Sequence, residues 1–229
     1  MLGVISAGIA PGLALVSYFY LRDQFEQEPV RNVFRVFLLG AILTFPIMFI
    51  QFVLQEEGLI NNGFLHAFFS AALMEEFFKW FLLFIAIYKH ADFDEPYDGI
   101  VYGTSISLGF ATVENILFLT ANGIEFAIGR ALLPVSSHAI FGVLMGYYLG
   151  KAKFNIYGRF HYWLVASFVV PYILHGLYDY ILVIGTNWMY YILPFMLFLW
   201  YFGLRKVKHA HILSRKHFHN QNENKNAAF

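Results

Sequence analysis

Two adjacent glutamates lie inside an apolar run that is long enough to cross a membrane. Glu75 and Glu76 fall in the middle of residues 64–88, and Lys79 follows one helical turn later. A charged side chain at the centre of a bilayer costs about 2.5–3.5 kcal/mol on insertion scales. Three charged residues so close together therefore indicate a structural or chemical role. On a helix both glutamates can reach the lysine, at spacings of three and four residues. An ion pair that holds helices together needs only one glutamate, so the second glutamate indicates acid–base chemistry.

Other ionisable residues fall in three further apolar stretches. His175 and Asp179 are four residues apart, so they share one face of a helix and the carboxylate can orient the imidazole. Glu114 and His138 lie in two earlier stretches. Each of these residues has a structural alternative: an intrahelical ion pair, a buried hydrogen-bonded pair, or a core histidine whose hydrogen bonds are satisfied.

A carboxylate base and a histidine around buried water can hydrolyse a peptide bond. We predict that Glu75 is the general base, with Glu76 and His175 holding the water and stabilising the oxyanion. The order of the two glutamates stays open. Lys79 would keep one carboxylate ionised, which would let the two glutamates differ in role.

The composition is that of a polytopic membrane protein. Of 229 residues, 59% are hydrophobic and 13% are charged, against about 25% charged in soluble domains. The net charge is zero, which suggests no nucleic-acid partner. There is no cysteine, so disulfides, thiolate metal sites and a cysteine nucleophile are excluded.

The apolar stretches predict an all-α protein with about seven transmembrane helices, because a span needs about 20 apolar residues. The predicted spans are residues 2–21, 33–54, 64–88, 99–121, 130–150, 161–185 and 188–204. The first span has no basic segment before it and no cleavage site after it, so we expect a retained helix rather than a signal peptide. We predict one membrane domain over residues 1–208 and a polar, disordered cytoplasmic tail over 209–229.

The basic residues predict the orientation. All 15 Lys and Arg except Lys79 and Arg130 fall on one side when seven helices are threaded through a membrane. The positive-inside rule then places the N-terminus outside and the C-terminus in the cytoplasm.

The predicted depths of the ionisable residues agree with one another. At 1.5 Å rise per residue, Glu75, Glu114, His138, His175 and Asp179 lie roughly 9–16 Å below the outer ends of their helices. Isolated structural pairs have no reason to share a depth. We therefore predict a common water-filled cavity in the outer half of the bilayer.

The metal content is predicted from the absence of known ligand motifs. The chain has no H-E-x-x-H helix for zinc. Zinc bound by two glutamates and one histidine is conceivable, but the weaker ligand set disfavours tight binding. We therefore predict no metal and no cofactor. The histidines of the tail are a weaker candidate for metal binding.

Two other classes of function use the same residues. A proton-coupled transporter or sensor would use them as a relay, but a relay needs ionisable groups that reach both faces. The cytoplasmic halves of the predicted spans nearly lack such groups. A scaffold would bind a membrane partner without cutting it.

Three motifs carry a resemblance to a known family. They are EEFFKW at residues 75–80, FATVEN at 110–115 and HGLYD at 175–179. With the N-terminal segment 5–24 and the segment 131–154, they resemble the PrsW family of bacterial membrane proteases over nearly the whole chain. A distant likeness to the CAAX-processing and bacteriocin-processing proteases departs at Lys79, Glu114 and Asp179, which makes a prenylated substrate doubtful.

The resemblance implies a function and a set of site residues. The family makes the first cut in the single-span anti-sigma factor RsiW, on its extracytoplasmic side, in the bacterial cell membrane under envelope stress. Glu75, Glu76 and His175 would be catalytic. The supporting residues would be Lys79, Glu114, Asn115, His138 and Asp179. The expected partners are membrane lipid and an RsiW-like substrate, with no nucleic acid.

Overall fold

The protein is helical throughout, as the sequence predicts. The computed structural model describes residues 1–227, apart from the side chains of residues 156 and 224–227, and has no strand among them. The longer helices are α1 (Leu2–Tyr20), α2 (Val30–Glu56), α4 (Met74–Ile87), α5 (Asp98–Asn122), α7 (Ser136–Lys153), α8 (Phe160–Val183) and α9 (Trp188–Ala227). The short ones are α3 (Gly63–Leu65), η1 (His66–Leu73), η2 (Ile124–Phe126), α6 (Ala127–Arg130), η3 (Ala131–Val135) and η4 (Ile156–Gly158).

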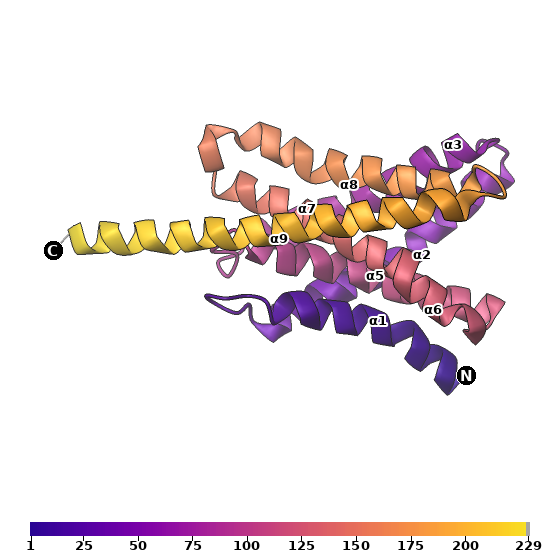
Figure 1. The fold of residues 1–229 in the computed structure, drawn as a ribbon, viewed down its shortest axis with the longest axis horizontal. Coiled ribbons are helices and arrows are strands. Elements are labelled where there is room, and N and C mark those ends of the chain that lie inside the picture. The colour runs from indigo at the N-terminus through magenta and orange to yellow at the C-terminus, as the bar shows by residue number, and fades with distance from the viewer. Residues whose placement is uncertain (228–229) are drawn as a thin grey trace.

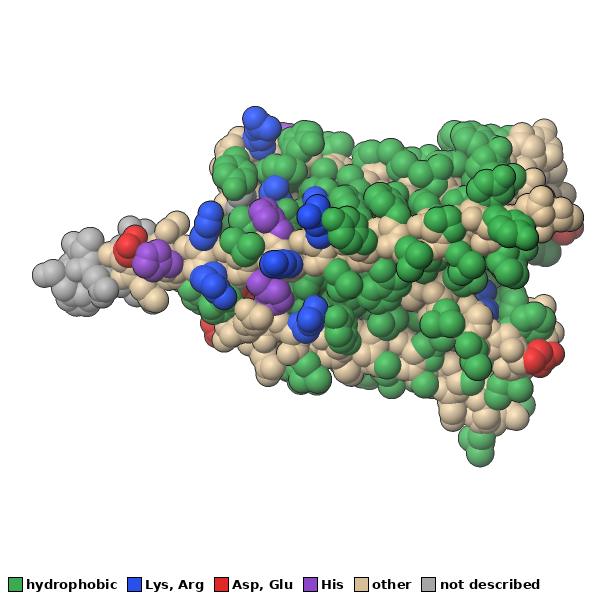
Figure 2. Space-filling view, viewed as in Figure 1, with side chains coloured by type: hydrophobic (Ala, Val, Ile, Leu, Met, Phe, Trp, Pro, Cys, Tyr) green, Lys and Arg blue, Asp and Glu red, His purple; other side chains and the backbone are tan. Residues whose placement is uncertain are grey.

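Five helical segments of the described chain are long and apolar enough to span a membrane. They are Leu2–Tyr20, Val30–Glu56, Asp98–Asn122, Ile124–Lys153 and Phe160–Val183. The protein is therefore a multi-pass membrane protein. Many large apolar side chains on the outer faces of these helices are exposed, as expected for groups that contact lipid (Figure 2).

Local residues set several helix ends. Pro29 precedes α2, and Gly123, with φ of 110°, ends α5. The Asn62 side chain caps the segment that leads into α4 by accepting a hydrogen bond from the Leu65 amide at 2.8 Å. These breaks keep the connections short.

The helices run side by side along the long axis of the molecule, and the two termini lie at opposite ends (Figure 1). α9 extends beyond the bundle at the C-terminal end. Its residues Val207, Ala210 and Leu213 are buried against the bundle, and the helix continues to Ala227. The division into a membrane domain over 1–208 and a disordered tail over 209–229 stays a prediction.

The core of the bundle is the contact between α5 and α7, and glycines allow it. Gly99 and Gly103 on α5 face Gly142 and Gly146 on α7, and a Cβ at any of these four positions would collide with backbone atoms of the facing helix. Such small residues spaced by four let membrane helices approach closely. The same two helices carry Glu114 and His138, so this packing fixes the distance between those side chains.

We expect Gly146→Ala to destabilise the bundle by about 1–3 kcal/mol, because the new methyl group would overlap the Gly99 carbonyl and force α5 and α7 apart. Gly129→Ala is the matched control, since a Cβ there meets nothing within 4 Å. Thermal unfolding in detergent measures both changes. Equal melting temperatures for the two variants would contradict the close approach.

Candidate active site

Two of the four helices that carry the clustered ionisable residues follow a π-helical segment. η1 ends at Leu73, two residues before Glu75 on α4. η3 ends at Val135, directly before the turn of α7 that carries His138. Such segments shift the direction in which later side chains point and are frequent at functional sites.

Lys79 joins the two glutamates, as their spacing predicts. Its Nζ atom lies 2.9 Å from Glu76 Oε1 and 3.2 Å from Glu75 Oε2. Lys79 and Glu76 are fully buried, and the ammonium also lies 4.2 Å from the centre of the Phe110 ring. A residue of the same helix therefore holds the Glu76 carboxylate in position.

His175 on α8 contacts the same glutamate from across the bundle. Its Nδ1 atom lies 2.9 Å from Glu76 Oε1. Its other ring nitrogen, Nε2, lies 3.3 Å from Asp179 Oδ2, one turn along the same helix. Phe141 stacks on the imidazole with ring centres 4.9 Å apart. The ring is therefore held in position from three sides.

His138 on α7 completes the cluster from a third helix. Its Nδ1 atom lies 3.2 Å from Lys79 Nζ, and its Nε2 atom lies 3.2 Å from Glu114 Oε2 on α5. The His138 and His175 rings meet edge to face with centres 5.0 Å apart. The four helices that were predicted to share a depth do bring their ionisable side chains together.

Arg130 is a member of this network that the sequence interpretation missed. Its guanidinium donates to Glu114 Oε1 at 2.9 Å and to Asn115 Oδ1 at 3.0 Å. The Asn115 amide donates in turn to the Gly8 carbonyl of α1 at 3.0 Å, so Asn115 holds α1 in place. The sequence does mark Arg130 as unusual, because it is the one basic residue assigned to the outer side of the predicted spans.

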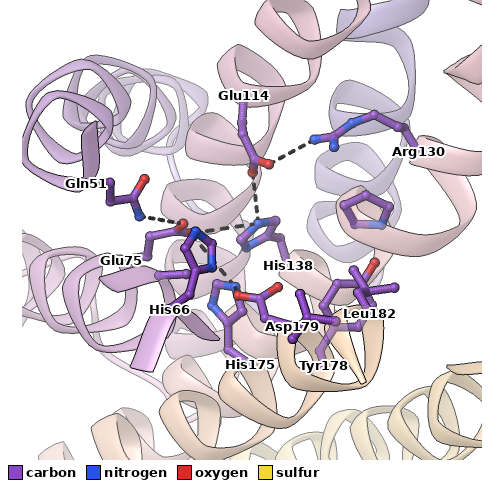
Figure 3. A pocket seen from close by; sticks show the side chains of 13 residues that line it. Gln51, His66, Glu75, Glu114, Arg130, His138, His175, Tyr178, Asp179 and Leu182 are labelled. Carbon is purple, nitrogen blue, oxygen red and sulfur yellow. Dashed lines mark hydrogen bonds and ion pairs between the residues drawn. The ribbon is translucent and has the colours of Figure 1, made fainter. Parts of the chain in front are cut away.

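A cavity of about 300 Å³ opens onto the cluster (Figure 3). Its polar lining comes from all four helices and their neighbours: Gln51, His66, Glu75, Glu114, Arg130, His138, His175, Tyr178 and Asp179. Glu75 faces this cavity, whereas Glu76 does not line it and is fully buried behind it. Gln51, which was also missed, donates to Glu75 Oε1 at 3.2 Å. The two adjacent glutamates therefore have different surroundings.

Four residues of the cluster can hold a metal ion. Glu75, Glu76, His138 and His175 each place one donor atom within 4.8 Å of the others, and all four are buried. Glu76 Oε2 is buried without a hydrogen-bond partner, which leaves one acceptor for a ligand. Histidine nitrogens with carboxylate oxygens are donors that zinc accepts. The cluster also has four carboxylates against two permanent cations, Lys79 and Arg130, so it favours a further positive charge.

A membrane-embedded helical bundle that gathers two glutamates and two histidines beside a cavity has the arrangement that a metal-dependent intramembrane hydrolase requires. The family model described as PrsW family intramembrane metalloprotease matches residues 28–203. The chain belongs to this family.

Curated relatives match along nearly the whole chain. The protein named Protease PrsW from Bacillus subtilis (strain 168) is 60% identical over 210 residues, which is 92% of this chain and 96% of the relative. Protease PrsW from Geobacillus kaustophilus (strain HTA426) is also 60% identical, over 92% and 93% of the two chains. Protease PrsW from Clostridioides difficile (strain 630) is 32% identical, over 89% and 90%. No solved structure matches the chain.

The comparisons confirm the family resemblance and correct the prediction about metal. The family is one of metalloproteases, so the prediction of no cofactor was wrong. The sequence interpretation counted two glutamates and one histidine as possible ligands, and the structure adds His138 as a fourth donor. The names of the relatives favour a protease over the transporter.

We expect Lys79→Met to destabilise the protein by about 3–5 kcal/mol, because it leaves two buried carboxylates facing no ammonium. Lys89→Met is the matched control, since Lys89 is exposed just after the same helix. Unfolding in detergent with a chelator present measures both. A Lys79→Met variant as stable as the control would show that the lysine does not neutralise the pair.

Proposed function

We propose that the chain is an intramembrane metalloprotease of the bacterial cell membrane that makes the first cut in a single-span anti-sigma factor of the RsiW type. The observation that carries this proposal is the cavity lined by Glu75 and both histidines. Hydrolysis requires the scissile peptide bond to lie beside a general base and a Lewis acid at the same time. This first cut would initiate an envelope-stress response. The resemblance of the three motifs to the PrsW family supports the substrate class.

We place the N-terminus outside and the C-terminus in the cytoplasm, with seven crossings. Residues 63–87 and the first part of α9 add two crossings to the five apolar segments. The termini lie at opposite ends of the bundle, which an odd number of crossings requires (Figure 1). Lys and Arg side chains gather where α9 leaves the bundle, as the positive-inside rule expects of the cytoplasmic side (Figure 2).

The cavity then lies toward the outer face. Its lining includes His66, Arg130 and Val183, which lie next to the connections at the end of the bundle opposite the basic cluster. This placement agrees with the depth calculated from the sequence. A substrate cut through this opening is cut on its extracytoplasmic side.

Three residues would hold the metal, and one would act as the base. Glu76, His138 and His175 form the ligand set, since catalytic zinc sites keep three protein ligands and one open position. Bound zinc would supply a Lewis acid that polarises the scissile carbonyl. Asp179 and Glu114 each face a ring nitrogen of a ligand histidine and fix the orientation of that ring.

Glu75 takes the proton from the attacking water, because it faces the cavity while its neighbour is sealed from it. Gln51 and Lys79 hold its two carboxylate oxygens at 3.2 Å each, so the side chain is oriented before substrate arrives. Glu75 then returns the proton to the leaving amine. This assigns different roles to the two adjacent glutamates.

The experiment is reconstitution of the full chain in liposomes with an RsiW-type protein tagged at both ends. We expect one cut on the extracytoplasmic side of the substrate's span, located by mass spectrometry of both fragments. The control substrate has its extracytoplasmic juxtamembrane segment replaced by a flexible sequence of equal length. Cleavage on the cytoplasmic side would overturn the orientation, and an intact substrate under conditions where another single-span protein is cut would overturn the substrate class.

A further inference from the structure

A second group of buried carboxylates lies at the opposite end of the bundle from the cavity. Asp23 and Glu28 belong to the connection between α1 and α2, and Glu95 and Asp98 lie where the connection after α4 enters α5. All four are at most 7% exposed, and Glu95 and Asp98 are fully buried. The proposed mechanism uses none of them.

Each of these carboxylates has at least one oxygen that is buried without a hydrogen-bond partner. The unpartnered atoms are Asp23 Oδ2, Glu28 Oε1, Asp98 Oδ1 and both carboxylate oxygens of Glu95. One donor atom each from Asp23, Glu95 and Asp98 lies within 4.8 Å of the others. Buried polar atoms are rarely left without a partner, so five in one place require either a bound cation or protons shared between neighbouring carboxylates.

The opposite oxygens of three of these carboxylates are held by the protein. Asp98 Oδ2 accepts from the backbone amides of Glu95 at 2.7 Å and Asp94 at 2.9 Å. The Tyr102 hydroxyl donates to Glu28 Oε2, and the Phe25 amide donates to Asp23 Oδ1 at 3.4 Å. The protein thus fixes one oxygen of each of these groups and leaves the other free.

The group lacks an ion pair with any basic side chain that the structure describes. Among these side chains, no Lys or Arg lies within 4.0 Å of a carboxylate oxygen of the four. Lys153 comes near this end, but its ammonium donates to the His90 carbonyl at 3.0 Å and lies over the Phe93 ring. Burial raises the pKa of Glu28 and of Glu95 to about 8, which expresses the free-energy cost of keeping these groups charged without a cation.

A cavity reaches one member of the group, Glu28. A cavity of about 320 Å³ lies beside Glu28 and is lined by the further acids Glu26, Asp92 and Asp94. Carboxylate oxygens alone, without a histidine, select hard cations such as Ca²⁺, Mn²⁺ and Mg²⁺. The donor set therefore differs in kind from that of the active site.

We propose that Asp23, Glu95 and Asp98, with Glu28 beside them, bind a hard divalent cation at the cytoplasmic end of the bundle. The cation would tie the connection between α1 and α2 to the start of α5. It would also steady α9, because Tyr97 in this segment donates its amide to Ser214 Oγ at 3.1 Å and stacks on His211. The site would be structural and separate from the catalytic metal.

The test measures Mn²⁺ binding by electron paramagnetic resonance on the full chain in detergent after chelation, with Ca²⁺ and Mg²⁺ as competitors. We expect Asp23→Asn/Glu95→Gln to weaken Mn²⁺ binding at one site by more than about 100-fold. Loss of a residue that only orients a ligand weakens binding by about 10–100-fold, so a larger loss indicates that these residues are ligands. Glu75→Gln/Glu76→Gln should keep that site. Glu57→Gln is the matched control, because Glu57 is an exposed acid just after α2 and lies outside both the group and the cavity beside it.

A second measurement follows thermal stability instead of Mn²⁺ binding. Ca²⁺ or Mn²⁺ at 100 times its dissociation constant should raise the melting temperature of the wild-type chain by about 5 °C. The Glu95→Gln variant should show a smaller rise. If the wild type binds no more Mn²⁺ than Asp23→Asn/Glu95→Gln and gains no thermal stability, the carboxylates share protons instead of a cation and the proposal is wrong.

Discussion

We expect Glu75→Gln to lower the rate of substrate cleavage by about 10²–10⁴-fold and to leave the bound metal in place. The amide cannot take a proton from water, yet it keeps the size of the side chain and can still accept hydrogen bonds. Glu75 faces the cavity and lies outside the proposed three-residue ligand set. Cleavage of the tagged substrate and metal content, measured on one purified sample, test both parts.

The matched control is Glu56→Gln, which changes an exposed carboxylate at the end of α2. It should leave both cleavage and metal content unchanged. If Glu75→Gln loses its metal while Glu76→Gln keeps it, the roles of the two adjacent glutamates are exchanged. Wild-type cleavage by Glu75→Gln would remove Glu75 from the mechanism.

We expect His175→Ala to remove the metal and cleavage together, and Asp179→Asn to weaken the affinity for zinc by about 10–100-fold. The graded effect follows from position: the His175 ring is a proposed ligand, whereas Asp179 contacts the ring from outside the ligand set at 3.3 Å. Glu114→Gln should resemble Asp179→Asn, because Glu114 holds His138 at 3.2 Å. Zinc titration of the chelated protein measures each affinity.

The control for this series is Glu125→Gln, an exposed carboxylate near Arg130 on the same side of the bundle. Its zinc affinity should equal that of the wild type. If excess zinc restores cleavage to Asp179→Asn but not to His175→Ala, the two residues act as assigned. Equal losses for both would mean that Asp179 is itself a ligand.

The helices and the meeting of the site residues were predictable because strong physical constraints act on them. An apolar run must form a helix inside a bilayer, and costly charges there must find one another. Glu75, Glu114, His138 and His175 were placed at a similar depth from their positions in the chain, and the structure brings them into contact. The π-helical segments η1 and η3 were not predictable, because no residue pattern marks them.

The metal was missed because ligand sets depend on distances that spacing along one helix does not give. His138 follows two serines in a separate helix, and this sequence context fits a core histidine equally well. The geometry that places His138 beside three other metal donors appears only after folding. Gln51 was missed for the same reason. Asp23, Glu28 and Glu95 lie in polar connections, where a carboxylate is normally solvated, so their burial had no signal in the sequence.

The most direct test of the central claim follows metal content and cleavage in one titration of the purified full chain. A chelator is added until the metal is gone, and zinc is then returned in steps. The account predicts about one zinc ion per chain in the ligand set Glu76, His138 and His175, with cleavage lost and regained in proportion to it. Full cleavage by the zinc-free chain, or wild-type zinc binding by His138→Ala/His175→Ala, would contradict it.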